Sequence, residues 1–305
     1  MKVLVTGCAG FAGSHIVDEI LRETDWDVIG LDSLTYAGHM ENIPDPTEPR
    51  FRFIYHDFRA PLPQRMLESI GRVDYIIHNG AETHVKTSFE NPELFFQSNA
   101  VGTMNMLEAA RILGPRVFLY TSTDEVFGQT DKPKYEQDAL KPSNPYSASK
   151  AAGEMLVMAY SRSFGLPCMI TRTMNMYGPR QDVEKFIPLV LDRMYRGLDV
   201  QVHCSPQGEV GSRQWLHVPD QAAALLFLLS NGTINNIYHI AGTRKTNLEV
   251  VGALNDVLGL GCVAHVVNAY DIWPGHDLHY CINDDKIRNL GWRPRLTFEQ
   301  GLRIL

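Results

Sequence analysis

Tyr146 and Lys150 are spaced so that together they could remove a proton from an alcohol. They begin and end the segment YSASK, and residues four apart share one face of a helix. A phenol has a pKa near 10, so its use as a base at neutral pH needs a pKa lowered by about three units, or about 4 kcal/mol. A neighbouring ammonium group can supply that field. The competing interpretation is a packed tyrosine beside a solvated lysine.

Two adjacent carboxyl groups, Asp124 and Glu125, follow an apolar run that ends near Thr121. Polar residues at the carboxyl end of a parallel strand lie at the crevice where ligands bind. If one acid keeps its proton it can donate it while the ionised one accepts another, which is the division of labour needed to eliminate water. Thr123 precedes them, where its hydroxyl can hydrogen-bond the tyrosine or a reacting oxygen. The alternative is a pair of solvent-facing loop acids.

A third motif, at residues 3–13, could hold a diphosphate. Its letters are VLVTGCAGFAG: an apolar run, then Gly7, Gly10 and Gly13, then the start of a helical pattern. Gly7 allows a tight turn, Gly10 lets the backbone approach a pyrophosphate, and Gly13 lets the helix pack closely on the strand. The free N–H groups of the helix then face the anion. The segment predicts a dinucleotide site, and a positive nicotinamide there would favour Tyr146 as a base.

The identity of the dinucleotide depends on Asp32. It follows Gly13 by nineteen residues, where a carboxylate can accept hydrogen bonds from an adenine ribose. Its charge would repel a 2′-phosphate, and residues 33–40 contain no Arg or Lys. The sequence therefore predicts NAD rather than NADP. Asp57, after the next apolar run, is placed either to meet the adenine edge or to cap a turn.

Short apolar runs alternate with longer segments of helical period, which is typical of a parallel sheet buried on both faces. The predicted strands are 2–6, 27–31, 52–55, 73–78, 117–121 and 168–171, and the predicted helices are 14–22, 92–113, 145–164, 186–196, 219–229, 247–258 and 298–305. The fold class is α/β: a Rossmann-type doubly wound parallel sheet with a smaller C-terminal α/β lobe. We expect an NAD-binding domain over 1–173 and a mainly substrate-binding lobe over 174–305, with room for segments that return to the first domain. The helical pattern still runs at Leu305, which is compatible with a trimmed terminus.

The composition excludes several classes of protein. The 305 residues include 28 Lys+Arg and 35 Asp+Glu, a net charge of −7, with no basic cluster for nucleic acid. No apolar run approaches the ~20 residues that cross a bilayer, and a strand-like run follows Met1 in place of a signal peptide, so we expect a cytoplasmic protein. The cysteines are scattered and odd in number, which predicts buried thiols and no disulfide framework: Cys8, Cys168, Cys204, Cys262 and Cys281. His276 and His279 lack a third ligand in register, so no metal site is expected.

Taken together, these motifs resemble those of the extended short-chain dehydrogenase/reductases of the NAD-dependent epimerase/dehydratase family. Within that family they are most similar to the nucleoside-diphosphate-glucose 4,6-dehydratases of the dTDP-glucose type. The matching segments cover nearly the whole chain: VLVTGCAGFAG, DSLTYAG from Asp32, AETHV from Ala81, STDEVFG from Ser122, NPYSASKAAGE from Asn144, NMYGP from Asn175, EKFIPL from Glu184 and PGHDLHY from Pro274. The Thr-Asp-Glu step is the discriminating motif, because related epimerases and decarboxylases usually lack the adjacent acids.

The resemblance implies a hydro-lyase with tightly bound NAD, acting on a nucleoside-diphosphate hexose in deoxysugar biosynthesis. Tyr146 would take the proton of the sugar C4 hydroxyl while hydride passes to NAD, and Lys150 would hold the ribose and lower the tyrosine pKa. Glu125 would then remove the C5 proton while Asp124 protonates the departing C6 hydroxyl. Hydride returned to C6 would give a 4-keto-6-deoxy sugar nucleotide.

The resemblance also implies a set of contacts. Expected around the cofactor are Gly7, Gly10, Phe11, Ala12, Gly13, Asp32, Ser33, Thr35, Asp57, Phe58, Tyr146 and Lys150, and expected around the substrate are Thr83, Asn175, Lys185, Arg213 and His276. The catalytic set is Thr123, Asp124, Glu125, Tyr146 and Lys150. Helices 92–113 and 145–164 pair in dimers of this superfamily, so a homodimer is expected by analogy. The chain departs from the family at Trp273, at residues 204–211 and at Asn79-Gly80, and these departures leave the nucleotide and sugar open.

Two other functions stay open at this point. An NAD-dependent nucleotide-sugar 4-epimerase would stop at C4 chemistry and return hydride to the opposite face of the sugar, which product analysis distinguishes. A non-catalytic NAD-binding regulator would retain the fold alone. The intact Tyr146, Lys150, Asp124 and Glu125 argue against the regulator.

Overall fold

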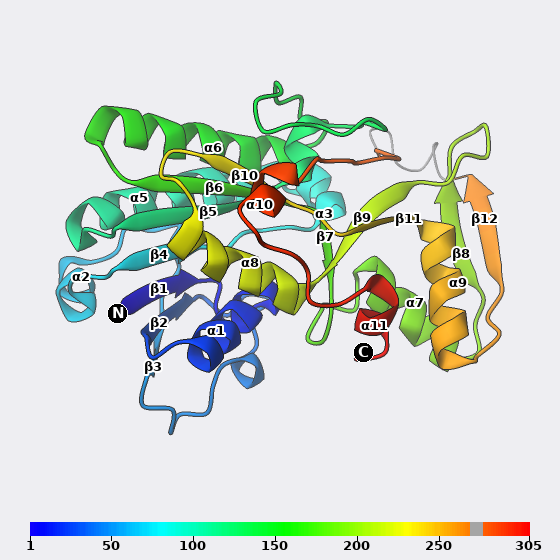
Figure 1. Cartoon of the computed structure of the whole chain (residues 1–305), viewed down its shortest axis with the longest axis horizontal. Helices are drawn as coiled ribbons and strands as arrows, with labels where there is room; N and C mark the ends of the chain where they lie inside the picture. The colour runs from blue at the N-terminus through cyan, green and yellow to red at the C-terminus, as the bar shows by residue number, and fades with distance from the viewer. Residues whose placement is uncertain (269–276) are drawn as a thin grey trace.

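The computed structural model describes residues 1–268 and 277–305, and a seven-stranded sheet forms its centre (Figure 1). The strands are β1 (Lys2–Thr6), β2 (Asp27–Asp32), β3 (Phe51–Tyr55), β4 (Tyr75–His78), β5 (Val117–Thr123), β6 (Cys168–Thr173) and β10 (Ile237–Ile240). All neighbours are parallel, in the order β10-β6-β5-β4-β1-β2-β3. The order reverses between β1 and β4, where the carboxyl ends of parallel strands form a ligand crevice. The predicted fold class is confirmed.

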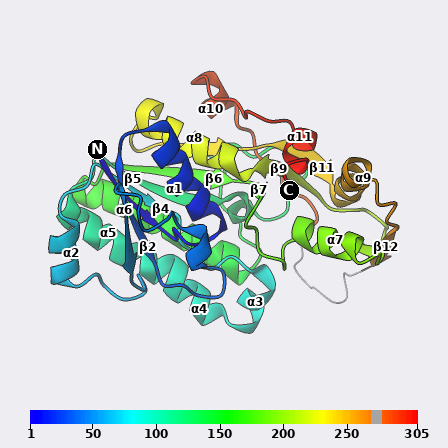
Figure 2. The ribbon, with the colours of Figure 1, turned by 90° about the horizontal axis from the view of Figure 1, so that it is seen from below.

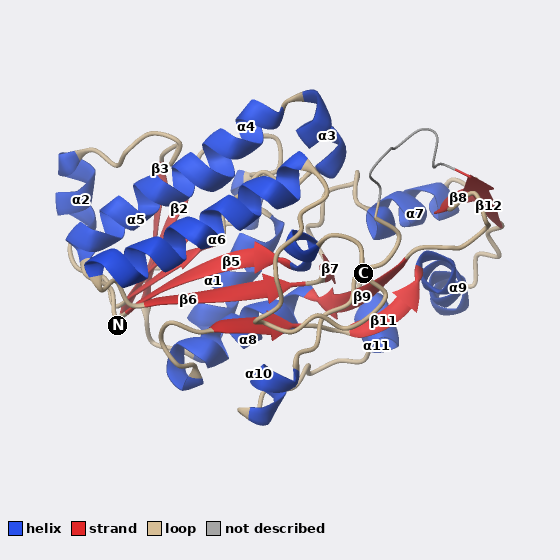
Figure 3. Ribbon diagram, turned by 90° about the horizontal axis from the view of Figure 1, so that it is seen from above, coloured by secondary structure: helices blue, strands red, loops and turns tan. Residues whose placement is uncertain are grey.

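Helices cover both faces of this sheet. On one face lie α1 (Phe11–Glu23) and α8 (Val218–Asn231), which pack against each other (Figure 2). On the other lie α2 (Gln64–Ile70), α5 (Gly102–Leu113) and α6 (Pro145–Phe164) (Figure 3). Side chains of β1 alternate between the two cores, since Val3 and Val5 join the first and Leu4 the second. Burial on both faces explains why the strands appear as unbroken apolar runs.

The predicted helix 92–113 forms as three consecutive segments. These are α4 (Pro92–Phe96), a π-helical turn η2 (Gln97–Val101), and α5. Asn91 begins the helix by accepting a hydrogen bond from Leu94 N, with Pro92 in the first turn. The π-helical turn carries Asn99, whose Oδ1 accepts from Glu82 N at 2.9 Å. Such turns often occur at functional sites, and this one reaches the end of β4.

A second lobe follows β6. It contains a three-stranded sheet of β11 (Thr243–Thr246), β9 (Ser212–His217) and β7 (Asn175–Tyr177), and a two-stranded sheet of β12 (Ala264–Asn268) and β8 (Val200–Cys204). Its helices are α7 (Phe186–Tyr195), α9 (Asn247–Leu258) and α11 (Phe298–Leu302). Val202, Trp215 and Leu254 belong to its own buried core. The remaining helical segments are η1 (Met40–Asn42), α3 (Val85–Glu90), η3 (Asp124–Phe127) and α10 (Asp285–Asn289).

Some sequence predictions differ from the structure. The predicted helix 298–305 was too long: α11 ends at Leu302, and the side chains of Ile304 and Leu305 are half exposed, so a longer helix would bury little more. All five cysteines are free thiols, as predicted, but Cys262, in the segment between α9 and β12, is only partly buried. Strand β10 lies in the large sheet although it follows the second lobe's first strands in sequence. The domain boundary at residue 173 stays a prediction. Within residues 1–268 and 277–305, no helix is both long and apolar enough for a membrane span.

Candidate functional site

The glycines of the N-terminal motif shape the crevice beside β1. Gly7 has a φ of +69°, in the left-handed region, and a Cβ there would come within 2.6 Å of Gly80 Cα. A Cβ on Gly13 would lie 1.8 Å from the carbonyl oxygen of Gly7, so only glycine allows α1 to pack this closely. Gly10 precedes α1 without a side-chain cap, which leaves the first N–H groups of the helix for a ligand. This backbone fits a pyrophosphate.

Asp32 is buried at the end of β2 and held by two main-chain donors. Its Oδ2 accepts from Ala9 N at 2.9 Å and its Oδ1 accepts from Leu34 N at 2.8 Å. These bonds fix the carboxylate in the wall of a cleft of about 300 Å³, beside Ser33 and Thr35. Each oxygen keeps a second lone pair with which it can accept from a ribose hydroxyl.

Asp57 makes the turn contact that one of the two sequence interpretations predicted, and its contact with the adenine edge stays a prediction. It lies in the cleft wall next to Phe58, and it also accepts a turn hydrogen bond from Arg59 N at 3.0 Å. The Arg59 side chain forms an ion pair with it at 2.5 Å and holds the pKa of the Asp57 carboxyl below its usual range. Because Arg59 is engaged by Asp57, its charge is partly neutralised at the edge of the cleft.

The start of α6 directs Tyr146 and Lys150 into the cleft. Asn144 and Ser147 form a capping box, in which Asn144 Oδ1 accepts from Ser147 N at 2.8 Å, and Pro145 occupies the first turn. Both Tyr146 and Lys150 are buried and line the cleft. Lys150 Nζ donates to the carbonyl oxygen of Thr121 at 2.7 Å and lies 4.4 Å from the centre of the Tyr120 ring.

The electrostatics around Tyr146 differ from the expectation. Burial raises its pKa well above 10, and the negative charge of Glu125 adds to the rise. A hydrogen bond with Thr123 is the contribution that lowers this pKa. Burial also lowers the pKa of Lys150 to about 7, although Glu154 one turn later opposes that change. Tyr146 therefore needs a further positive charge, bound in the cleft, before it can act as a base.

The adjacent acids occupy the turn η3 at the end of β5. Thr123 Oγ1 accepts from Glu125 N at 3.2 Å and donates to Asp124 Oδ1 at 3.1 Å. Burial raises the pKa of Asp124 to about 8, and the charge of Glu125 contributes to the rise. Asp124 Oδ2 is buried without a hydrogen-bond partner among the described residues. Asp124 thus keeps its proton at neutral pH, as an acid catalyst requires.

Glu125 has a different environment from its neighbour. Burial raises its pKa as well, while the positive charges of Arg213 and Lys185 oppose that rise. Its Oε2 lies 3.4 Å from the hydroxyl oxygen of Tyr280. The two acids lie in the same cleft but see different charges, which is the arrangement expected of an acid and a base.

The structure brings nearly all of the expected contacts to one cleft. All twelve expected cofactor contacts and the five expected catalytic residues line it, together with Thr83, Asn175 and Lys185. Arg213 does not line it; its guanidinium donates to the carbonyl oxygens of Asp277 and Leu278 and lies 4.4 Å from the Tyr280 ring. His276 and Trp273 lie outside the described residues. The functional roles of these residues stay predictions.

Several cleft residues were not among the expected contacts, and Glu82, Tyr36 and Gln221 are three of them. Glu82 is buried, and burial raises its pKa. Glu82 lies in the loop after β4, and Asp124 comes directly after β5. The position of Glu82 beyond the carboxyl end of a parallel strand could therefore have identified it from the sequence. Tyr36 lies in the segment after Asp32, inside a matched motif. Gln221 arrives on α8 and donates from Nε2 to Thr173 Oγ1 at 2.9 Å, a position that no local sequence signal indicates.

Comparison with known proteins identifies relatives over the whole chain. A family model described as GDP-mannose 4,6-dehydratase matches residues 4–305. The low-salt glycan biosynthesis protein Agl12 of Haloferax volcanii is 38% identical, covering 99% of this chain and 96% of that protein. A crystal structure of the dTDP-glucose 4,6-dehydratase DesIV from Streptomyces venezuelae, with NAD bound, is similar with a TM-score of 0.91 and 37% identity, covering 99% of this chain and 95% of that one.

A plant relative is longer than this chain. The trifunctional UDP-glucose 4,6-dehydratase/UDP-4-keto-6-deoxy-D-glucose 3,5-epimerase/UDP-4-keto-L-rhamnose-reductase RHM1 of Arabidopsis thaliana is 38% identical over 99% of this chain. The chain spans 46% of that relative's length. The similarity therefore extends over less than half of the trifunctional protein.

Proposed function

The chain belongs to the GDP-mannose 4,6-dehydratase family, and on this premise we propose that it catalyses the NAD-dependent 4,6-dehydration of a nucleoside-diphosphate hexose, of the dTDP-glucose or UDP-glucose type. The product would be the 4-keto-6-deoxy sugar nucleotide. The observation that carries the proposal is the presence of Asp124 and Glu125 in the same cleft as Tyr146 and Lys150. A 4-epimerase has no step that uses an acid and a base beyond C4, whereas elimination of water needs both.

NAD fits the residues of the cleft. The glycines around α1 leave room and N–H groups for the pyrophosphate, and the buried carboxylate of Asp32 favours a ribose with free hydroxyls. Bound NAD would accept hydride from C4 of the sugar and later return it to C6. Its positive ring would also supply the charge that Tyr146 needs in order to lose its proton.

The first step depends on Tyr146, Lys150 and Thr123. Tyr146 takes the proton of the C4 hydroxyl as hydride leaves C4, because α6 directs its hydroxyl into the cleft, where it is hydrogen-bonded with Thr123. Thr123 orients that hydroxyl through its own hydrogen bond. Lys150, held by the carbonyl oxygen of Thr121, binds the cofactor ribose.

The elimination of water depends on the two acids. A 4-keto group makes the C5 proton acidic, and Glu125 removes it, since Arg213 and Lys185 stabilise its ionised form. Asp124 keeps its proton through burial and gives it to the C6 hydroxyl, which leaves as water. Without this proton the leaving group would be hydroxide, a far poorer one.

The proposal also covers the contacts with the substrate, the location of the protein and its oligomeric state. Thr83, Asn175 and Lys185 lie where they can contact the sugar and diphosphate, and the lobe over 174–305 would hold most of the sugar nucleotide. Arg213 can reach the diphosphate only if it leaves part of its present contacts with the 277–278 backbone. We also propose that the protein is cytoplasmic and forms a homodimer through the helical segment 92–113 (α4, η2 and α5) and α6.

A panel of sugar nucleotides tests the proposal. The purified protein with NAD is incubated with dTDP-, UDP-, CDP- and GDP-hexoses, and each product is weighed by mass spectrometry. We expect loss of one water from a glucose-type substrate. A product of unchanged mass but altered C4 configuration would instead identify a 4-epimerase, and no reaction with any substrate would favour a non-catalytic protein.

A further inference from the structure

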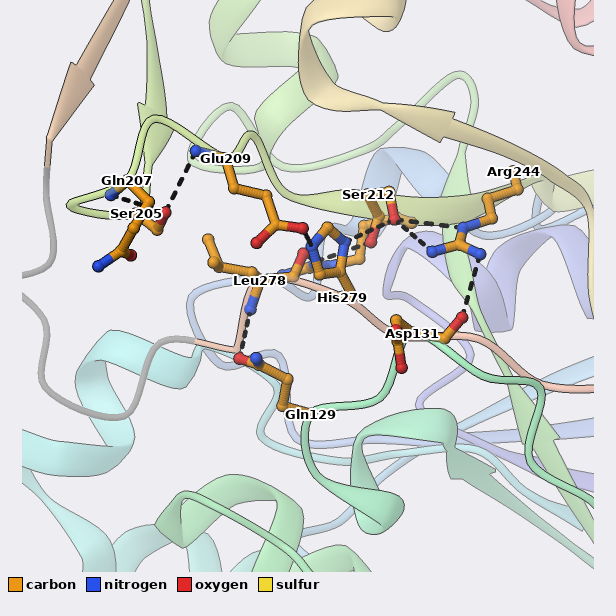
Figure 4. Close-up of polar contacts among 10 residues, drawn as sticks. Gln129, Asp131, Ser205, Gln207, Glu209, Ser212, Arg244, Leu278 and His279 are labelled. Carbon is orange, nitrogen blue, oxygen red and sulfur yellow. Dashed lines mark hydrogen bonds and ion pairs between the residues drawn. The ribbon is translucent and has the colours of Figure 1, made fainter.

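A polar cluster outside the cleft joins three segments of the second lobe (Figure 4). Its centre is His279, whose Nδ1 lies 2.9 Å from Ser212 Oγ and whose Nε2 lies 2.9 Å from Glu209 Oε1. Arg244, on β11, donates from Nε and Nη2 to the same Ser212 oxygen at 3.3 and 3.1 Å. Ser212 and His279 are buried, whereas the Glu209 side chain is 64% exposed.

The hydrogen bonds of the cluster fit one consistent assignment of donors and acceptors. The two N–H groups of Arg244 use both lone pairs of the Ser212 oxygen, so the serine proton is directed to Nδ1 of His279. That nitrogen must then be unprotonated, and Nε2 carries the proton that is donated to Glu209. The resulting chain runs from Arg244 through Ser212 and His279 to Glu209, with every polar atom of the imidazole satisfied.

The order Ser–His–Glu is also that of a hydrolase triad, but the surroundings do not support a nucleophile. Ser212 is 4% exposed, and a guanidinium group donates to the oxygen that would have to attack a substrate. Arg244 also donates to the carbonyl oxygen of Asp131 at 3.2 Å, so it is a bracing side chain between two segments. The cluster is therefore a tether that holds parts of the chain together.

The tethered segment is the stretch of main chain over 277–282. Ser212 N donates to the carbonyl oxygen of Leu278 at 2.9 Å, and Leu278 N donates to Gln129 Oε1 at 3.0 Å. A Cβ on Gly211 would meet the Leu278 oxygen at 2.7 Å, so the backbone at Gly211 and the backbone at Leu278 lie close together. His279 supplies the side-chain contact that joins this segment to the 205–209 turn.

This segment carries groups that face Glu125. The Tyr280 hydroxyl lies 3.4 Å from Glu125 Oε2 and donates to Asp277 Oδ2 at 2.7 Å. Arg213 is held by the carbonyl oxygens of Asp277 and Leu278, with its guanidinium over the Tyr280 ring. The charged or titratable groups that act on Glu125 or lie beside it are Arg213, Lys185, Asp277, Asp124, Tyr146 and Tyr280.

We propose that His279 is a positioning residue for the elimination of water: by bridging Ser212 and Glu209 it fixes the segment 277–280, and through that segment it sets Arg213 and Tyr280 against Glu125. The proposal rests on the function proposed above. The direct effect is on the acids of η3, because Arg213 acts on Asp124 and Glu125 and the Tyr280 hydroxyl lies 3.4 Å from Glu125, whereas Tyr146 is affected only indirectly, through those acids. Loss of the tether should therefore affect dehydration more than C4 oxidation.

The test compares His279→Ala and His279→Asn in the full-length protein with NAD and the substrate found by the panel. The asparagine places an oxygen near the position of Nδ1, so it keeps the bond to Ser212 and loses the one to Glu209. We expect His279→Ala to form enzyme-bound NADH, read by absorbance, at close to the unmodified rate, while water is lost about 10²-fold more slowly, as for a misplacement of about 1 Å. His279→Asn should recover part of that loss with KM unchanged.

The matched control is His265→Ala. It removes another imidazole–carboxylate contact of the second lobe, from His265 on β12 to Asp199 at 2.8 Å, and this contact involves no residue of segment 277–282. In His265→Ala, C4 oxidation and the loss of water should both proceed at the rates of the unmodified protein. Equal slowing of oxidation and dehydration in His279→Ala, or undiminished dehydration, would overturn the proposal.

Two further outcomes, a variant that does not fold and an unmodified protein without activity, can be distinguished from each other. If His279→Ala does not fold, by circular dichroism, His279→Asn decides alone: an unchanged ratio of the two rates contradicts the proposal and a selective loss of dehydration supports it. If the unmodified protein forms neither NADH nor a dehydrated sugar from any substrate, the proposed function itself is wrong, and the positioning role is overturned with it.

Discussion

Lys150 Nζ donates a hydrogen bond to the carbonyl oxygen of Thr121 at 2.7 Å. This bond connects α6, which carries Tyr146, to β5, which leads directly into Thr123, Asp124 and Glu125. The proposed base for C4 and the proposed base and acid for C5 and C6 therefore lie on two elements that one buried hydrogen bond connects. Because different residues serve the two half-reactions, single substitutions can separate the steps, and the predictions for Tyr146, Glu125 and Asp124 use this.

Asp32→Ala should reduce the preference for NAD over NADP. In the unmodified protein the buried carboxylate favours ribose hydroxyls and repels a 2′-phosphate, so NAD should bind at least tenfold more tightly, or about 1.4 kcal/mol. Titration of both cofactors against both proteins measures the ratio. Equal affinities of the unmodified protein for NAD and NADP would contradict the cofactor assignment.

Tyr146→Phe should abolish C4 oxidation while NAD binding stays nearly intact. Only the hydroxyl that accepts the proton is removed, and general base catalysis contributes about 10²- to 10⁴-fold. Lys150→Ala should impair both oxidation and NAD binding, because Lys150 lies in the cofactor wall of the cleft. Rapid NADH formation by Tyr146→Phe would show that another group is the base.

Glu125→Gln should still oxidise C4 and accumulate enzyme-bound NADH, because Glu125 acts only after the first hydride transfer. Asp124→Asn should also oxidise C4 but lose water about 10²- to 10⁴-fold more slowly. In deuterated water the unmodified enzyme should place one deuterium at C5 and pass the original C4 hydrogen to C6. Unlabelled C5 in a dehydrated product would remove Glu125 from this role.

The rate of dehydration should fall as the pH rises through about 8. Asp124 can donate only while protonated, and burial raises its pKa to about 8. On the acidic side the rate should fall where Glu125 gains a proton, at a pH above the usual range for glutamate, since burial raises its pKa too. A pH profile of single-turnover water loss measures both limbs. A rate that still increases above pH 9 would be inconsistent with Asp124 as the acid.

Gly13→Ala should weaken NAD binding by tenfold or more. Its Cβ would lie 1.8 Å from the Gly7 carbonyl oxygen, so α1 must move away from the phosphate loop. Gly252→Ala in α9 is the control, since a Cβ there meets nothing within 4 Å. That variant should keep NAD affinity and gain about 0.5–1 kcal/mol of stability from helix propensity. Calorimetry measures the NAD affinity, and thermal unfolding measures the stability. Equal NAD affinities of Gly13→Ala and Gly252→Ala would count against the role of Gly13.

Sequence alone was enough for the features that depend on local order. The three glycines, the strand before them and the helix after them predicted the phosphate-binding loop, and the structure has β1 at Lys2–Thr6 and α6 at Pro145–Phe164 as predicted. Asp32 and the acids after β5 were found because strand ends in a parallel sheet meet at one edge, so position along the chain implies position in space. These signals are short-range, and tertiary packing does not override them.

Only the tertiary structure decided the features that join distant segments. Gln221 enters the cleft from α8, and Arg213 is turned toward the 277–278 backbone by contacts across more than sixty residues. Burial and the charge of Glu125 raise the pKa of Tyr146, and Lys150, which the YSASK spacing places one turn away, donates to Thr121. A pKa depends on the dielectric surroundings and on all nearby charges, and these are set by the packing of the whole chain rather than by the spacing of two residues.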